Sequence, residues 1–267
     1  MIQDISPKVF NNSYVKTKPK DNDIIIMFLN DSIYLNHDKS FVRYSELSDK
    51  SIDLYFCFSV DEDSVYITSD LNQNSYLAVH TKEIRYFEKS WMAFVGATAL
   101  QIHSWLLNNM FCGKCGTIMF SSNKERAQIC TNCSNIVYPK IQPAVIVLIK
   151  NGSKIIITKY TNKYTKIALV AGYCEIGETA EQTVSREVFE EVGLRVKNIT
   201  YYKSQPWPFS SSLLLGYYCD LDGDDTITLD ENELAEAIWV DKEDLPTTYD
   251  EISLTQQLIK AFKYDKL

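Results

Sequence analysis

Four cysteines in two close pairs constrain the middle of this 267-residue chain more than any other feature. Two residues separate Cys112 from Cys115. After a gap of fourteen residues, Cys130 and Cys133 repeat that spacing. Such pairs suit a tetrahedral Zn²⁺ with four thiolates, because each tight turn offers two sulfurs. Gly116 follows the second cysteine and permits the tight backbone of a zinc knuckle. We therefore predict one structural zinc ion per chain, since four protein ligands leave no open position for water.

The N-terminus and the hydropathy bear on the compartment. The first stretch, MIQDISPKVFNNSYVK, lacks the basic-then-apolar order of a signal peptide, so we expect a reducing cytoplasm. In that compartment the seven cysteines are expected to be metal ligands or free thiols, and disulfides are the poorer alternative. No window reaches the roughly 18 to 20 uncharged apolar residues that a spanning helix needs, so no membrane partner is expected.

The net charge of −8 argues against a general binder of the nucleic-acid backbone, because that binding normally needs a basic surface. A small polyanionic substrate remains compatible with this charge, provided that a local cation offsets the field.

The regions before the cysteines read as a β-rich domain. Residues 23–29, 52–60 and 64–69 are rich in β-branched and aromatic residues, which favours strands. Apolar residues at helical spacing predict a long helix over residues 88–111. We therefore predict three domains: a β-rich N-terminal domain that ends in the long helix, a zinc ribbon, and a C-terminal domain, over residues 1–110, 111–139 and 140–267.

The C-terminal domain mixes strands and helices, which gives an α+β chain overall. Two apolar runs flank the turn at residues 150–153 and predict a β-hairpin. Further strands are expected at residues 212–221 and 237–240, and an amphipathic packing helix at residues 251–264.

Between these elements, the stretch SREVFEEVG crowds three carboxylates onto one helical surface. Glu187, Glu190 and Glu191 stand three and four residues apart, where like charges repel. They also lie in the C-terminal half of the helix, where the dipole disfavours anions. Thr179 with Gln182 resembles a capping box at the start of this helix, and Gly193 fits the left-handed position just after its end. A divalent Mg²⁺ or Mn²⁺ ion would compensate this charge; the alternative is a solvated acidic face.

The cluster belongs to a longer pattern. It runs from Gly172 over five residues to Glu178, over seven more to Arg186, and ends in Glu-Glu-Val-Gly-Leu at residues 190–194. At each fixed position this pattern resembles the box that defines the Nudix hydrolases. The resemblance implies an α/β/α sandwich with a mixed sheet, and hydrolysis of a nucleoside diphosphate linked to another moiety.

The same resemblance implies roles for individual residues. The carboxylates of Glu187, Glu190 and Glu191 would hold the catalytic Mg²⁺ or Mn²⁺, joined by the backbone carbonyl of Ala171. Glu178 and Arg186 would orient the loop and the helix. We take Glu190 or Glu191 as the base that accepts the proton of the attacking water; the sequence does not separate base from ligand.

A second resemblance narrows the family. The motif SQPWPF, residues 204–209, lies beyond the box, and the cysteine module with Tyr138-Pro139 precedes it. Together these features resemble the NADH pyrophosphatases, whose zinc ribbon stands before the Nudix domain. That family implies a homodimer with shared active sites, which cleaves NADH or NAD⁺ to nicotinamide mononucleotide and AMP. Some members also remove an NAD cap from the 5′ end of RNA.

Carried over by position, the family's substrate contacts fall on several segments of this chain. They are Gln205, Pro206, Trp207, Pro208, Phe209, Ser210, Ser211 and Ser212, with Tyr138, Glu125 and Arg85, and a further metal-binding Glu233. The chain departs from the family at Ser210, where proline is usual, so discrimination of the nicotinamide end is in doubt there. Two alternatives remain: an enzyme that acts chiefly on NAD-capped RNA, and a zinc-ribbon nucleic-acid-binding protein with an inactive Nudix fold.

Overall fold

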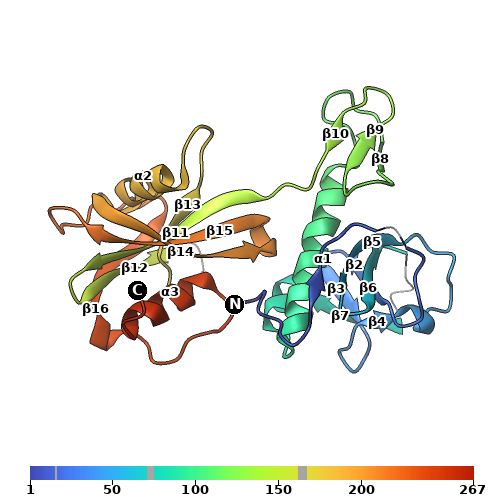
Figure 1. Ribbon diagram of the computed structural model, residues 1–267, viewed down its shortest axis with the longest axis horizontal. Coiled ribbons are helices and arrows are strands. Elements are labelled where there is room, and N and C mark those ends of the chain that lie inside the picture. The colour runs from blue at the N-terminus through green and yellow to red at the C-terminus, as the bar shows by residue number, and fades with distance from the viewer. Residues whose placement is uncertain (16, 71–74, 162–166) are drawn as a thin grey trace. The chain divides into compact units, whose positions relative to one another are not determined.

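The computed structural model describes residues 1–15, 17–70, 75–161 and 167–267 (Figure 1). The chain divides into two compact units, residues 2–140 and residues 141–267, the latter joined by Met1. This division groups the cysteine module with the N-terminal sheet, and the three predicted domain boundaries stay a prediction. Within the described ranges, no helix combines the length and the apolar character needed to cross a membrane.

The N-terminal unit is built on a twisted sheet in the order β1-β5-β6-β2-β3-β7, with β4 paired to β2. Most neighbours are antiparallel, while β2 and β6 run parallel. The three runs predicted as strands are confirmed as β2, β5 and β6. The strands are β1 (Phe10–Asn11), β2 (Ile24–Leu29), β3 (Ser32–Leu35), β4 (Val42–Arg43), β5 (Tyr55–Val60), β6 (Asp63–Thr68) and β7 (Leu77–His80), and short 3-10 helices span Tyr44–Glu46 and Thr81–Tyr86.

The long helix predicted over residues 88–111 is confirmed as α1 (Ser90–Asn108), which packs on this sheet and ends earlier than expected. A side chain at Gly96 would meet Ile84 at 3.1 Å, so the glycine allows close packing there. Phe111, which was predicted to be helical, instead forms an isolated β-bridge with Ile118. The helix stops because the chain must turn there into the first cysteine pair.

The cysteine module forms a three-stranded antiparallel sheet in the order β10-β9-β8. Its inner face buries Cys112, Met119 and Cys130 in a small cluster of their own. The loop before β9 docks on the N-terminal sheet through Arg126, which donates to the Asn12 side chain at 2.9 Å and to the carbonyl of Cys57. The strands are β8 (Met119–Ser121), β9 (Gln128–Cys130) and β10 (Ile136–Val137).

The C-terminal unit holds a mixed sheet in the order β14-β15-β11-β12-β16, with β13 paired to β11. Strands β11 and β15 are parallel, and the other pairs are antiparallel. The predicted hairpin is therefore confirmed as β11 and β12. The strands are β11 (Gln142–Asn151), β12 (Lys154–Tyr160), β13 (Val170–Tyr173), β14 (Val196–Trp207), β15 (Ser212–Leu221) and β16 (Leu234–Asp241), with 3-10 turns at Pro208–Ser210 and Lys242–Asp244.

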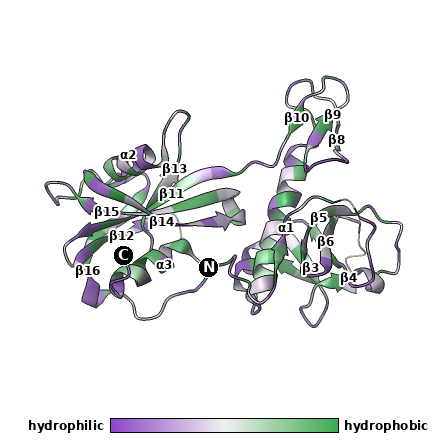
Figure 2. Cartoon of the chain, in the orientation of Figure 1, coloured by the Kyte–Doolittle hydropathy of each residue, from purple (hydrophilic) through white to green (hydrophobic). Residues whose placement is uncertain are grey.

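Helices α2 (Ala180–Val192) and α3 (Leu254–Lys263) cover opposite faces of this sheet. The central part of strand β11, residues 144–149, is continuously apolar (Figure 2). Val145 and Val147 pack in the cluster of α2, whereas Ile146 and Leu148 pack in the cluster of α3. A strand that is buried on both faces needs apolar residues at every position. The α/β/α sandwich with a mixed sheet is thus confirmed.

Candidate active site and zinc centre

The four cysteines of the ribbon converge without help from distant parts of the chain. Their sulfur atoms all lie within 4.8 Å of one another. Cys112 Sγ is 3.6 Å from Cys133 Sγ, and Cys115 Sγ is 3.4 Å from Cys130 Sγ. Four thiolates about 2.3 Å from a tetrahedral Zn²⁺ would stand roughly 3.8 Å apart, so the cluster fits that ion.

Local structure explains the convergence. Gly116 closes the first knuckle with a φ of 73°, a conformation that favours glycine. Hydrogen bonding to Thr117 lowers the pKa of Cys115 to about 5, which favours the thiolate that a metal binds. The structure therefore supports a closed structural zinc site on the predicted ligands.

Helix α2 carries the glutamates of the Nudix-like box, and its own sequence determines where it begins and ends. The Thr179 hydroxyl accepts from the backbone of Gln182 at 3.2 Å, and the Gln182 side chain accepts from the backbone of Thr179 at 2.8 Å. Gly193 ends the helix in the left-handed region with a φ of 71°. Both features match the sequence prediction, and they fix the residues at which α2 begins and ends.

Of the three clustered carboxylates, two are turned into the protein. Glu191 is 2% exposed and Glu187 is 9% exposed, while Glu190 lies on the surface. Among the residues that the structure describes, neither side-chain oxygen of Glu191 finds a hydrogen-bond partner. A buried carboxylate without a partner is costly, and a bound cation is the usual compensation. Glu191 is therefore the strongest sign in the fold of a cation site.

Gly172 makes room for this arrangement. A Cβ at that position would lie 1.9 Å from Cδ and 2.0 and 2.2 Å from the two side-chain oxygens of Glu187. The glycine of the box is therefore required because the carboxyl group of Glu187 packs directly against the backbone of β13. Sequence reasoning placed this glycine in the motif but did not find its contact.

Arg186 organises the loop and the helix. Its guanidinium binds Glu178 through two bonds, Nε to Oε1 at 2.7 Å and Nη2 to Oε2 at 2.9 Å. Nη1 also donates to Glu187 at 2.7 Å and to Glu190 at 2.9 Å. Nη2 reaches the carbonyl of Tyr173 at 2.9 Å. The single cation thus ties the box loop to α2 and offsets part of the crowded charge.

The electrostatics follow from these contacts. The bond with Arg186 lowers the pKa of Glu178 to about 2, so this carboxylate stays charged. Burial raises the pKa of Glu187. Burial, reinforced by the charges of Glu187 and Glu233, raises the pKa of Glu191 to about 8. Glu178 is thus an ion-pair partner, whereas Glu187 and Glu191 are carboxyls whose charge needs a cation.

Glu233 reaches this group from another element. The backbone of Asp230 donates to the carbonyl of Glu191 at 3.0 Å, which brings the segment before β16 to the end of α2. The exposed Glu233 then lies within electrostatic reach of Glu187 and Glu191. Among the described residues, the cysteines alone form a set of at least three ligand atoms as close as 4.8 Å. Arg186 binds both Glu187 and Glu190, which keeps the carboxylate oxygens from forming so close a set.

The SQPWPF motif forms the end of β14 and the turn after it. The rings of Trp207 and Phe209 meet edge to face, with centroids 5.2 Å apart. Pro208 opens the turn, and Ser211 closes it in the left-handed region with a φ of 54°. The Ser210 hydroxyl lies 2.9 Å from that of Ser212. The prolines and the hydroxyl pair fix the shape of this predicted substrate wall, and Pro206 is exposed beside it.

Gln205 behaves differently from the rest of the motif. It is fully buried, and its amide binds the backbone at Ile252 and Leu254, at 2.7 Å in each case. The sequence carried no signal for these bonds, because the two partners stand almost fifty residues further along the chain.

Three predicted substrate residues belong to the other compact unit. The Tyr138 hydroxyl donates to Glu125 at 3.1 Å, so these two side chains lie together. Arg85 lies in the 3-10 helix Thr81–Tyr86, where its guanidinium is 5.6 Å from the ring centroid of Tyr86. That these three residues reach the substrate stays a prediction.

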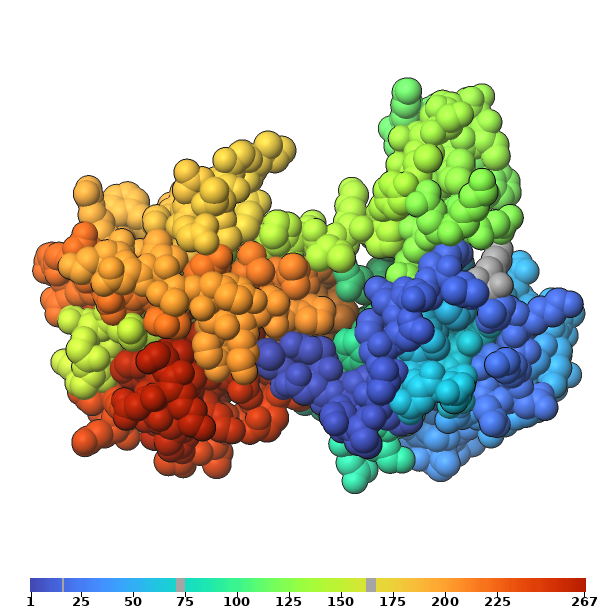
Figure 3. Space-filling view, viewed as in Figure 1, coloured from blue at the N-terminus to red at the C-terminus, as the bar shows by residue number. Residues whose placement is uncertain are grey.

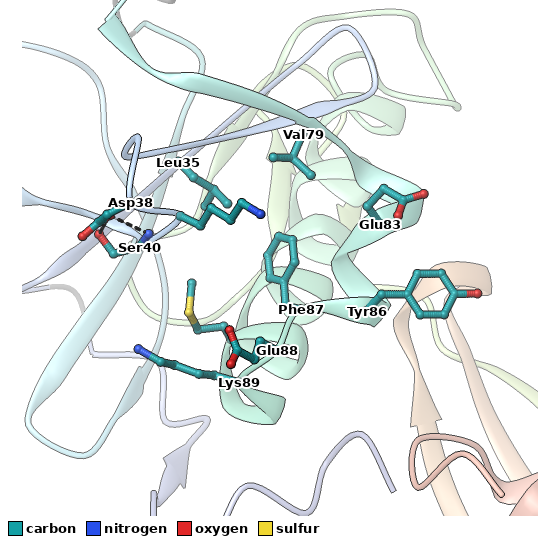
Figure 4. Close-up of a pocket in the computed structure, with 11 residues that line it drawn as sticks. Leu35, Asp38, Ser40, Val79, Glu83, Tyr86, Phe87, Glu88 and Lys89 are labelled. Atoms are coloured by element: carbon teal, nitrogen blue, oxygen red, sulfur yellow. Dashed lines mark hydrogen bonds between the residues drawn. The ribbon is translucent and has the colours of Figure 1, made fainter. Parts of the chain in front are cut away.

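The same unit contains a cavity of about 480 Å³ that is lined in part by Glu83 and Tyr86 of the 3-10 helix Thr81–Tyr86. Figure 4 shows the ring of Phe87 in its lining and the ring of Tyr86 directed away from it. Charged side chains of both signs, two lysines and three acidic residues, line it together with the apolar Leu35, Val79 and Met92. This mixed lining does not single out one class of ligand.

Comparison with known proteins agrees with the geometry. Residues 140–260 match the NUDIX domain family, and residues 107–138 match the NADH pyrophosphatase zinc ribbon domain. The chain is 42% identical over 148 residues to the NAD-capped RNA hydrolase NudC of Enterobacter sp. (strain 638), covering 55% of this chain and 57% of that protein. The protein of the same name from Escherichia coli (strain K12 / DH10B) is 40% identical over 148 residues with the same coverage.

The chain therefore matches little more than half of the length of these relatives. Among solved structures, a Nudix hydrolase from Nitrosomonas europaea superposes with a TM-score of 0.51 and 21% identity, covering 58% of this chain and 91% of that one. This likeness supports the fold. The two family matches follow each other along the sequence, so residues 107–260 combine the NADH pyrophosphatase zinc ribbon domain with a NUDIX domain.

Proposed function

We propose that this protein hydrolyses the pyrophosphate of NADH and NAD⁺ to nicotinamide mononucleotide and AMP, with Mg²⁺ or Mn²⁺. The observation that carries the proposal is the buried carboxyl group of Glu191, which has no hydrogen-bond partner and lies within electrostatic reach of Glu187 and Glu233. A pyrophosphate is a polyanion, and a site made of carboxylates accepts it only together with cations. The proposed ligands are Glu187, Glu190, Glu191 and Glu233 with the carbonyl of Ala171.

The residues of the chain have separate tasks in this reaction. Divalent cations in such a site neutralise phosphate charge and lower the pKa of a water molecule. Glu187 and Glu191 hold charge at the inner edge of α2, and Arg186 keeps the loop from moving away from that edge. Glu190 or Glu191 accepts the proton of the attacking water. Trp207 and Phe209 form an aromatic wall for a flat ring of the dinucleotide.

Removal of the NAD cap from RNA is the second candidate, and the names of the similar proteins favour it. The same pyrophosphate is broken in both reactions, so the two share one site. They differ in the RNA that follows the adenosine, which would lie against surfaces beyond the dinucleotide pocket. The net charge of −8 favours the free dinucleotide.

A product assay separates these candidates. The protein is incubated with NADH, NAD⁺, ADP-ribose and NAD-capped RNA, with Mg²⁺ or Mn²⁺ and then with chelator. We expect nicotinamide mononucleotide and AMP from NADH, and loss of all turnover with chelator. Turnover of the capped RNA alone would select the second candidate. No cleavage of any substrate would support a zinc-ribbon binding protein with an inactive Nudix fold and would reject the enzyme.

The assignment of Glu191 has its own test. Replacing Glu191 by Gln removes the negative charge at constant size, so kcat should fall at least about a thousandfold. Glu181→Gln makes the same change in the first turn of α2, on an exposed side chain, and serves as the matched control. A near-normal kcat for Glu191→Gln would refute the role of this residue.

We also propose that the protein forms a homodimer, and the outer face of the ribbon supports this. Cross-strand pairing puts Phe120, Ile129 and Ile136 in one row, and the Phe111–Ile118 bridge extends it. Phe120 is 57% exposed and Ile136 is 46% exposed, although the strands bury their other face around the cysteines. The ribbon is visible as a lobe of its unit in Figure 3. An apolar sheet face of this kind marks an interaction surface.

Sedimentation of the wild type and of Phe120→Asp tests the dimer. We expect a dimer for the wild type and a dissociated, zinc-loaded monomer for the variant, because a charge opposes burial of the row. Lys124→Asp, an exposed change in the neighbouring loop, is the control. A monomeric wild type would reject the dimer.

The cysteines support a reducing location. All seven lie among the described residues and none of them forms a disulfide there, which is compatible with the cytoplasm, the compartment that we propose.

A further inference from the structure

The buried amide of Gln205 connects two segments that the sequence keeps far apart. Its Nε2 donates to the carbonyl of Ile252 at 2.7 Å, and its Oε1 accepts from the backbone of Leu254 at 2.7 Å. The side chain is 0% exposed. A buried amide that makes two short bonds to one backbone segment acts as a clamp on that segment.

The clamped segment is the start of α3. Ser253 caps the helix by accepting from the backbone of Gln256 at 3.4 Å, and its own hydroxyl donates to Asp250 at 3.1 Å. Leu254 is fully buried, and it lies so close to Gly216 that a side chain there would meet it at 3.1 Å. The first turn of α3 is therefore bound to β14 by hydrogen bonds and packed against β15.

The same strand carries the aromatic wall. Gln205 pairs with Leu214 on β15, and two residues further on Trp207 pairs with Ser212. Because side chains in a strand alternate between faces, positions 205 and 207 share one face. A movement of Gln205 relative to α3 would displace the end of β14 and the Trp207 ring with it.

We infer that Gln205 is a positioning residue that locks the end of β14 to the start of α3 and thereby sets the position of Trp207. It acts through the backbone at Ile252 and Leu254, and its amide makes no direct bond to the nucleotide. This inference rests on the proposed dinucleotide hydrolysis, for which Trp207 is part of the substrate wall.

The substitution Gln205→Glu tests the lock because its effect depends on pH. A protonated carboxyl both donates and accepts, so it reproduces the two bonds of the amide. An ionised carboxylate has no proton to donate to the carbonyl oxygen of Ile252, and the repulsion between the two oxygens pushes the segment away and weakens the bond from the Leu254 amide as well. The lock should therefore be intact at low pH and weakened as pH rises, and the wild-type amide has no such dependence.

The experiment measures KM and kcat for NADH from pH 5.5 to 8.5, as ratios of variant to wild type. We expect a KM ratio near one at the acid end and a rise of about tenfold at the alkaline end, with a smaller change in kcat. Gln256→Glu places the same group in the first turn of α3, outside the clamp, and its ratio should stay flat. A pH-independent KM ratio for Gln205→Glu would overturn the inference.

Hydrogen exchange of the ligand-free protein distinguishes a lock from a substrate contact. The lock predicts faster exchange at the Leu254 amide in Gln205→Glu at pH 8.5 than in the wild type, and this readout needs no activity. A raised KM with unchanged exchange would mean that Gln205 touches the nucleotide, and would overturn the inference. If the wild type cleaves no dinucleotide, the proposed function fails, while the exchange result still decides whether the lock exists.

Discussion

The zinc ribbon and the edge of α2 that carries Glu187, Glu190 and Glu191, called the α2 edge below, both gather anionic ligands. They do so by different means. In the ribbon, two tight turns bring four sulfurs within 4.8 Å, and the buried cluster around them consists of Cys112, Met119 and Cys130. At α2, the carboxylates are held by Arg186, by the backbone at Gly172 and by a helix packed on a large core. Apart from the docking contacts of Arg126, the ribbon has only this small cluster to stabilise it, so the predicted zinc ion should contribute much of its stability, whereas the α2 edge is formed by the protein itself.

This difference predicts opposite responses to the loss of metal. Metal binding supplies folding free energy where the chain cannot bury enough apolar surface. Where a packed core already orders the ligands, the ion adds chemistry and relieves charge repulsion.

The largest expected effect tests the ribbon. Cys130→Ser removes one thiolate, so the zinc should be lost and residues 112–137 should lose protection from hydrogen exchange. The zinc contribution to folding in such modules is about 10–16 kcal/mol. Cys174→Ser, a half-buried cysteine outside the ribbon, should keep one zinc per chain by elemental analysis. A Cys130→Ser protein with full zinc content would contradict the comparison.

The next effect tests the preformed edge at α2. Gly172→Ala places a methyl group where the Glu187 carboxyl lies, at 1.9 to 2.2 Å, so this carboxylate must move. We expect kcat/KM to fall by about a hundredfold or more, with the unit still folded. In the ribbon, an added Cβ at Gly113 meets nothing within 4 Å, so Gly113→Ala should be almost neutral. Equal activities of the two variants would show that the edge is not preformed.

The pH dependence of stability gives a smaller effect with a defined sign. Burial raises the pKa of Glu191 to about 8 in the folded protein, from an ordinary value of 4.5. The folded state therefore binds more protons between these values, and without divalent cations the free energy of unfolding should fall as pH rises from 5 to 8. The change should be on the order of 2 kcal/mol for the C-terminal unit and should be smaller in Glu191→Gln. A flat wild-type profile in urea titrations would argue against the buried charge.

The smallest effect compares two left-handed glycines. Gly116 in the ribbon has open space around it, while an added Cβ at Gly193 would lie 2.7 Å from the Cβ of Thr228. Gly116→Ala should cost about 1 kcal/mol, from the backbone conformation alone. Gly193→Ala should cost more, because it adds a clash at the end of α2. Thermal unfolding of the two variants, with zinc present, measures the difference.

Much of the fold was predictable because it is encoded locally. The cysteine spacing, the capping box of Thr179 and Gln182 and the stop at Gly193 all act within a few residues, and the structure has each of them. The hairpin of β11 and β12 also followed from its turn. The error at the end of α1 has a local origin too, since apolar spacing continued to Phe111 beyond the point where the knuckle begins.

The sequence by itself determined which four cysteines converge, where the box helix starts and stops, and which carboxylates share its edge. Only the tertiary structure decided that Glu187 packs on Gly172, that Glu191 is buried without a partner, and that Gln205 holds the start of α3. The physical reason is range. Turns and caps depend on neighbours in the chain, whereas burial and long-range hydrogen bonds depend on which strands pair and which helices cover them.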